Sequence, residues 1–129
     1  MNTERVKRLV AACTICGAAL VGAQAALAKD GDVLVRGTCT KASASKLKLS
    51  EEDGRIEVEF EVDQNRIGVR WVVVLRRPST VLVRTTRVTR APSGSFELRR
   101  VVADLAGRDR ITARATSPSG EVCRATAAF

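Results

Sequence analysis

The sequence predicts an all-β protein, an immunoglobulin-like antiparallel sandwich of about seven strands that follows a signal peptide. Apolar and polar residues alternate with a period of two over most of the chain, which is typical of strands with one buried face. Clusters of Gly, Pro, Asp and Ser separate the alternating runs and indicate turns. The single tryptophan, Trp71, falls on the third main strand, and about 100 residues is the size of an immunoglobulin-like domain.

The first 28 residues have the order of a secretory signal. A basic start precedes an apolar run from Leu9 to about Val21, and Ala26-Leu27-Ala28 forms a small-residue cleavage pattern. We therefore expect cleavage after Ala28, one secreted domain over residues 29–129, and an extracellular or cell-envelope location. The apolar run is shorter than the roughly 20 residues that span a membrane, so no transmembrane anchor is expected after cleavage.

Two of the four cysteines, Cys13 and Cys16, lie in this signal segment. Their C-T-I-C spacing resembles a redox or metal-binding motif, but cleavage would remove both. The domain keeps Cys39 and Cys123. An exported domain with two cysteines is expected to join them, so the sequence predicts a Cys39–Cys123 disulfide between its first and last strands.

Two strands are predicted most clearly. In residues 55–63 the apolar side chains Ile56, Val58, Phe60 and Val62 should point inward and Glu57, Glu59 and Glu61 outward. In residues 69–76 the inward set is Val69, Trp71, Val73 and Leu75. The glutamates are expected to form a solvated face beside Arg99 or lysines of neighbouring strands.

The other strands are predicted around these two. Val33, Val35, Gly37 and Cys39 should share one face of the first strand, and Leu47 and Leu49 mark a short second piece. Residues 80–88 and the region from Phe96 to Val102 form two more strands. A final hairpin turns at Ser117-Pro118-Ser119-Gly120, with Ile111, Ala113, Ala115, Cys123, Ala125, Ala127 and Phe129 inward.

The charge of the chain is +8, and arginines supply most of it. If the Trp71 strand pairs with residues 110–116, and that strand with the last one, their outer face combines arginines with valines. This candidate binding face comprises Arg70, Val72, Val74, Arg76, Arg110, Thr112, Arg114, Val122 and Arg124. The competing interpretation is an ordinary charged surface with a compositional bias toward arginine, because scattered exposed valines need no explanation.

The composition disfavours most enzyme classes. The chain has no histidine or tyrosine and no expected free thiol, which excludes a Ser-His-Asp triad and a cysteine nucleophile. Ser43-Ala44-Ser45-Lys46 matches the S-x-x-K motif of penicillin-binding enzymes, but its companion motifs are missing, so a chance match is expected. We expect no cofactor and no metal: zinc lacks ligands, and Asp30-Gly31-Asp32 or Glu51-Glu52-Asp53 lack the spacing of an EF-hand calcium loop.

The aromatic residues argue against two kinds of ligand. Phe60, Trp71, Phe96 and Phe129 all fall on predicted inward faces. Single-stranded nucleic acids and sugars are bound on exposed aromatic platforms, so nucleic acid is disfavoured as a partner.

The chain also resembles a family. D-G-R-I-E-V-E-F-E-V-D, A-P-S-G-S-F-E-L-R-R and D-L-A-G-R-D-R-I-T-A-R-A-T-S-P-S-G-E-V-C-R-A are similar to segments of small exported actinobacterial proteins of unknown function. The resemblance covers nearly all of the domain and implies a signal peptide and one disulfide-closed β-sandwich. It implies no functional residues.

Three functions follow as hypotheses, in descending order. The first is a non-catalytic secreted module that binds an extracellular protein or an anionic cell-wall polymer through the Arg/Val face. The second is a structural envelope protein that self-associates, with its acidic sheet against the basic sheet of another copy. The third is a carboxylate-based enzyme such as a glycoside hydrolase using Glu57 and Glu59.

Overall fold

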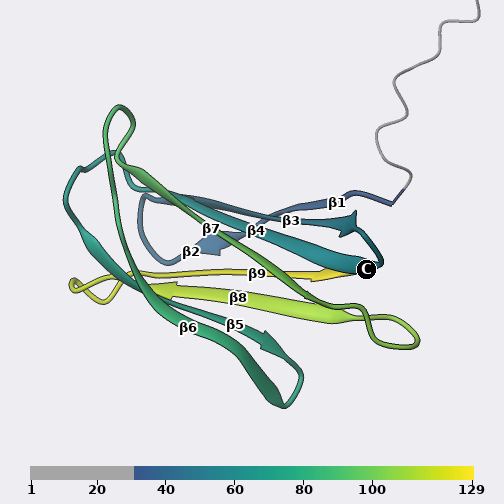
Figure 1. Cartoon of the computed structure of the whole chain (residues 1–129). Coiled ribbons are helices and arrows are strands. Elements are labelled where there is room, and N and C mark those ends of the chain that lie inside the picture. Colours follow the sequence, from purple (N-terminus) through teal and green to yellow (C-terminus); the bar gives the residue numbers. More distant parts are fainter. Residues whose placement is uncertain (1–30) are drawn as a thin grey trace, which may run out of the picture.

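The computed structural model describes residues 31–129, which form strands and no helix (Figure 1). The strands are β1 (Val33–Arg36), β2 (Thr38–Cys39), β3 (Ala44–Glu52), β4 (Arg55–Asp63), β5 (Arg70–Arg77), β6 (Thr80–Val88), β7 (Ser95–Ala103), β8 (Arg110–Thr116) and β9 (Val122–Ala128). The expected signal peptide, with Cys13, Cys16 and the cleavage position after Ala28, lies outside the described residues.

The strands form two antiparallel sheets that face each other as a sandwich (Figure 1). The four-stranded sheet has the order β1-β3-β4-β7, and the five-stranded sheet has the order β2-β9-β8-β5-β6. The all-β prediction is confirmed, and so is the expected pairing of β5 with β8 and of β8 with β9. The described residues hold nine strands, more than the expected seven or so.

The core fills the space between the sheets, and the predicted alternation is confirmed. The four-stranded sheet contributes Leu47, Leu49, Ile56, Val58, Phe60, Val62, Phe96 and Leu98, and the five-stranded sheet contributes Trp71, Val73, Leu75, Ile111, Ala113, Ala115, Cys123, Ala125 and Ala127. Phe129 is half-buried against this core. Burial of each large apolar side chain stabilises the fold by about 1.5 to 3 kcal/mol. Because the inward faces supply this stability, the outward faces can carry charged and polar residues.

The first expected strand is wrong in one respect, because the chain changes sheets at Gly37. β1 pairs with β3 in one sheet, whereas β2 pairs with β9 in the other. A Cβ at Gly37 would lie 2.2 Å from Ser45 Oγ and 2.5 Å from the Arg124 carbonyl oxygen. Glycine therefore allows the backbone to cross between the layers, and this crossing brings Cys39 beside the last strand.

The expected short piece around Leu47 and Leu49 is also wrong in length, because β3 spans nine residues. It forms a tight hairpin with β4 through Asp53 and Gly54, both of which have positive φ. Ser43-Ala44-Ser45-Lys46 runs from a loop into β3. The S-x-x-K serine of penicillin-binding enzymes begins a helix, so this match has the wrong local structure. Within residues 31–129 we find no helix long and apolar enough to cross a membrane.

Candidate functional site

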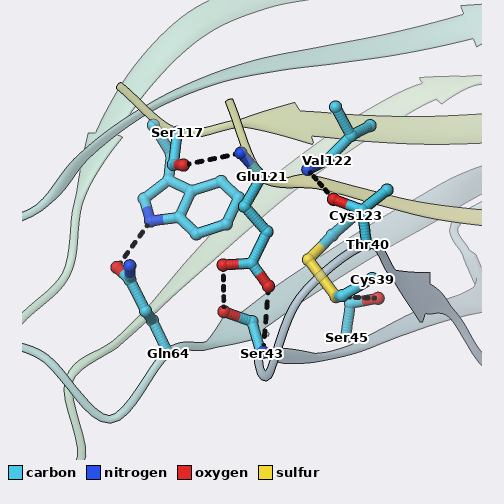
Figure 2. Close-up of a disulfide and its surroundings, with 10 residues drawn as sticks. Cys39, Thr40, Ser43, Ser45, Gln64, Ser117, Glu121, Val122 and Cys123 are labelled. Atoms are coloured by element: carbon cyan, nitrogen blue, oxygen red, sulfur yellow. Dashed lines mark hydrogen bonds between the residues drawn. A yellow bond between two sulfur atoms is a disulfide. The ribbon is translucent and has the colours of Figure 1, made fainter. Parts of the chain in front are cut away.

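The disulfide predicted from the sequence is present between Cys39 and Cys123 (Figure 2). The two residues are direct cross-strand partners of β2 and β9, with their Cα atoms 4.0 Å apart. Backbone and side-chain hydrogen bonds between Thr40 and Val122, both of 2.9 Å, continue the pairing past the cysteines. The bond therefore fastens a two-residue edge strand to the last strand of the domain.

A buried carboxylate lies beside this disulfide. Glu121 is 3% exposed, and its two oxygens accept hydrogen bonds of 2.9 Å from the Ser43 amide and the Ser43 hydroxyl (Figure 2). Its own amide is satisfied by the Ser117 hydroxyl at 3.1 Å. Glu121 thus ties the β8–β9 turn to the loop before β3, which makes it a structural residue that the sequence analysis missed. A single glutamate next to a turn gives no sequence signal for burial.

The potential metal ligands are occupied in other contacts. Cys39, Glu121 and Cys123 lie within 4.8 Å of one another, but the two sulfurs are bonded to each other and offer no thiolate. Asp32 lies 3.5 Å from the Lys48 ammonium, and Glu51 accepts a 2.7 Å hydrogen bond from the Gly54 amide. One residue in each of the two acidic segments, Asp32 and Glu51, therefore has a local contact. Asp30 lies outside the described residues.

The predicted Arg/Val face is assembled on the outer side of the five-stranded sheet. Arg70, Arg76, Arg110, Arg114 and Arg124 are exposed, and Val72 is 43% exposed. Val74, Thr112 and Val122 are half-buried on the same side. All the residues placed on this face from the sequence therefore lie together.

The structure adds β6 to this face. Arg84, Thr86 and Val88 are the cross-strand partners of Val74, Val72 and Arg70, so they share its outer side. The sequence analysis gave residues 80–88 no inward or outward side and paired them with no strand. In the structure the pairing of β5 and β6 also shifts by one residue between Leu75 and Arg76. We use the name arginine face for the complete set, which is Arg70, Val72, Val74, Arg76, Arg84, Thr86, Val88, Arg110, Thr112, Arg114, Thr116, Val122, Arg124 and Thr126.

The charge of the five-stranded sheet has one sign. Its strands contain arginines and no Asp, Glu or Lys. Arg77 forms an ion pair with Asp109, and 3.0 Å separates Arg77 Nε from Asp109 Oδ1. The geometry of this contact does not meet that of a hydrogen bond. The Arg77 guanidinium also donates to the Ala103 carbonyl oxygen. Within residues 31–129, the six arginines of the arginine face have no carboxylate within 4.0 Å.

The opposite sheet is different, because three of its outward carboxylates are paired with cations. Glu61 lies 3.0 Å from the Lys46 ammonium, and Glu59 lies 3.8 Å from that of Lys48. Glu57 accepts a 2.8 Å hydrogen bond from Arg99 Nε. The expected neighbours of the glutamates are thus confirmed, whereas the expected solvation of Glu57 is wrong: it is 6% exposed.

These contacts separate the pKa values of two neighbouring carboxyls. The hydrogen bond from Arg99 holds the pKa of Glu57 below its ordinary value, against the opposing effect of burial. Burial, together with the adjacent Glu57 carboxylate, raises the pKa of Glu59. The two groups therefore respond differently to acid although both belong to β4.

The aromatic side chains do not contribute to either outer face. Phe60 and Trp71 are fully buried and Phe96 is 5% exposed, as the sequence predicts. Trp71 packs against Phe96 with ring centroids 6.1 Å apart, and its indole N–H donates to Gln64 Oε1 at 3.1 Å. Neither sheet offers an aromatic stacking platform among the residues that the structure describes.

No protein-family model, curated protein or solved structure matches this chain.

Proposed function

We propose that this chain is an exported, non-catalytic binding module, which attaches to an anionic extracellular or cell-wall partner through the arginine face. The observation that carries the proposal is the segregation of charge. Six outward arginines lie on one sheet without a carboxylate within ion-pair distance in residues 31–129, while Glu57, Glu59 and Glu61 on the other sheet are each paired with a cation.

An unneutralised cationic sheet favours a partner of opposite charge. Arg114 and Arg124 are direct cross-strand partners, and like charges in this position destabilise a sheet. An anion bound between them removes that repulsion, so part of the binding free energy is relief of a cost present in the free protein. Arginine also presents a planar fork of N–H donors that suits carboxylate and phosphate oxygens.

The export and the immunoglobulin-like class belong to the same proposal. The order β9-β8-β5 corresponds to the G-F-C order of immunoglobulin domains, and Trp71 lies on the strand that corresponds to C. The other sheet departs from that fold, because β3 and β4 are neighbours joined by a hairpin, whereas strand B of an immunoglobulin domain is followed by a strand of the opposite sheet. The disulfide accords with an oxidising compartment.

The two other hypotheses have weaker support. Self-association through opposite charges needs an acidic sheet, but Lys46, Lys48 and Arg99 already neutralise Glu57, Glu59 and Glu61. A carboxylate-based enzyme needs an accessible acid pair, and Glu57 is buried beneath Arg99.

The test compares two double variants with equal loss of charge. Arg70→Gln/Arg114→Gln removes two arginines of the arginine face, and Arg66→Gln/Arg108→Gln removes two exposed arginines from loops. We expect wild type and the loop variant to be retained on an immobilised polyanion at low salt, and the face variant to elute at lower salt. Equal elution of the two variants would remove the arginine face as the binding surface.

A further inference from the structure

The arginine face contains a shallow hollow of about 430 Å³. Val72 and Val74 lie at its centre on β5, with Arg70 and Arg76 farther along the same strand in each direction. The cross-strand partners of Val74 are Arg84 on β6 and Arg114 on β8. Two valines are thus surrounded by arginines on four sides.

The polar groups of this hollow are donors for an anion. Each guanidinium carries five N–H groups and no acceptor, and Thr116 adds a hydroxyl at the wall nearest the β8–β9 turn. The residues that line the hollow include no Asp or Glu. The chemistry of the site therefore excludes a cationic ligand and favours an anion with several acceptor oxygens.

The arrangement of arginines favours a tetrahedral anion over a planar one. Arg84, Arg114 and Arg124 lie in one row across the sheet, with Val74 between the first two. Neighbouring strands are about 4.8 Å apart, so Arg114 and Arg124 are close enough to share one anion. The lone pairs of a carboxylate lie in one plane, which suits a single guanidinium fork, whereas each unesterified oxygen of a phosphodiester accepts from directions around its P–O axis and can be shared by two forks that project side by side.

The residues around the hollow also limit the chemistry of the segment that links successive anionic groups in a polymeric ligand. The aromatic residues Phe60, Trp71 and Phe96 are buried, so the arginine face has no ring on which a nucleic-acid base could stack. Val72 and Val74 instead offer aliphatic contacts, which suit the carbon atoms of a polyol chain.

We infer that the arginine face binds a phosphodiester polymer without aromatic bases, which lies across the strands along the row from Arg84 to Arg124. This inference rests on the proposed function and names its ligand class. The polymer would cross three strand spacings, about 14 Å, between the first and the last arginine of the row.

The experiment measures binding of three probes at equal anion concentration by calorimetry at low salt. Poly(glycerol phosphate) is the base-free phosphodiester, polygalacturonate the polycarboxylate, and single-stranded DNA the base-bearing phosphodiester. We expect poly(glycerol phosphate) to bind at least about tenfold more tightly than polygalacturonate, because two arginines share each of its best contacts. Single-stranded DNA should bind more weakly than poly(glycerol phosphate).

Variants locate the binding. Arg114→Gln/Arg124→Gln should weaken poly(glycerol phosphate) binding at least about tenfold, and Arg66→Gln/Arg108→Gln should change it less than about threefold. Thermal unfolding of both variants at or above the wild-type temperature would show that the sandwich is intact, because removal of the Arg114–Arg124 repulsion can only stabilise the sheet. The exposed positions of all four arginines make unfolding an unexpected result.

The outcomes separate the inference from the proposed function. Polygalacturonate or DNA that binds as tightly as poly(glycerol phosphate), with the same loss in the Arg114/Arg124 variant, would overturn the ligand class and leave the arginine face as the binding surface. Absence of binding to all three probes, or equal losses in the face and loop variants, would overturn both.

Discussion

Removal of the Cys39–Cys123 disulfide should destabilise the domain by several kcal/mol. The bond joins residues separated by 84 positions in the sequence. Chain-entropy arithmetic for a loop of this length gives a ceiling of about 4.6 kcal/mol at 25 °C, because the cross-link restricts the unfolded chain. We therefore expect the Cys39→Ala/Cys123→Ala variant to lose between about 2 and 4.6 kcal/mol of unfolding free energy.

The assay is urea unfolding followed by the fluorescence of Trp71, whose side chain is fully buried. Wild type with reductant present provides the control, and it should unfold with nearly the free energy of the double variant. Hydrogen exchange should also speed up at the Thr40 amide, which bonds to the Val122 carbonyl beside the disulfide. A loss below about 1 kcal/mol would refute the view that the bond stabilises the domain through its long loop.

Three further predictions follow from local contacts. Gly37→Ala should lower the free energy of unfolding, measured by heat or urea, by about 1 to 3 kcal/mol. An added Ser45→Ala should restore only part of this stability, because the Arg124 carbonyl oxygen still blocks the new Cβ. A Gly37→Ala variant as stable as wild type would contradict the close approach at this position. In an NMR titration Glu57 should titrate below and Glu59 above the ordinary carboxyl range. Glu57 therefore stabilises the fold above its unfolded pKa and loses this contribution as pH falls through its folded pKa, whereas ionisation of Glu59 costs stability as pH rises through the folded pKa of Glu59. Arg99→Gln should raise the pKa of Glu57. An unchanged pKa of Glu57 in this variant would rule out the Arg99 guanidinium as the cause. Glu121→Ala should lose about 1 to 3 kcal/mol of unfolding free energy in urea and Glu121→Gln less, because alanine leaves the half-buried Ser43 amide without its acceptor. Equal losses in the two variants would disprove that role.

Much of the fold could be predicted from the sequence where alternation is strict. In β4 and β5 every second residue is a large apolar one, so the inward faces of Ile56 to Val62 and of Trp71 to Leu75 follow from the period alone. The same period placed the arginines of β8 and β9, which is why most of the arginine face was predictable.

The missed features depend on contacts between distant segments. The alternation of Val33, Val35, Gly37 and Cys39 continues through the point where the chain changes sheets, and only the close approach of Arg124 and Ser45 reveals the crossing. The outward side of β6 was not predicted from the sequence, and its pairing with β5 shifts by one residue. The burial of Glu57 depends on Arg99, which comes from β7, the other strand beside β4.

The salt dependence of polyanion binding tests the central claim most directly. Each phosphate contact that a basic residue makes contributes roughly 0.7 to the slope of log affinity against log salt for a single-stranded polyanion. Arg114→Gln/Arg124→Gln should therefore flatten the slope for poly(glycerol phosphate) by about 1.4 relative to wild type, while Arg66→Gln/Arg108→Gln leaves it nearly unchanged. Parallel slopes for wild type and the face variant would contradict binding through this sheet.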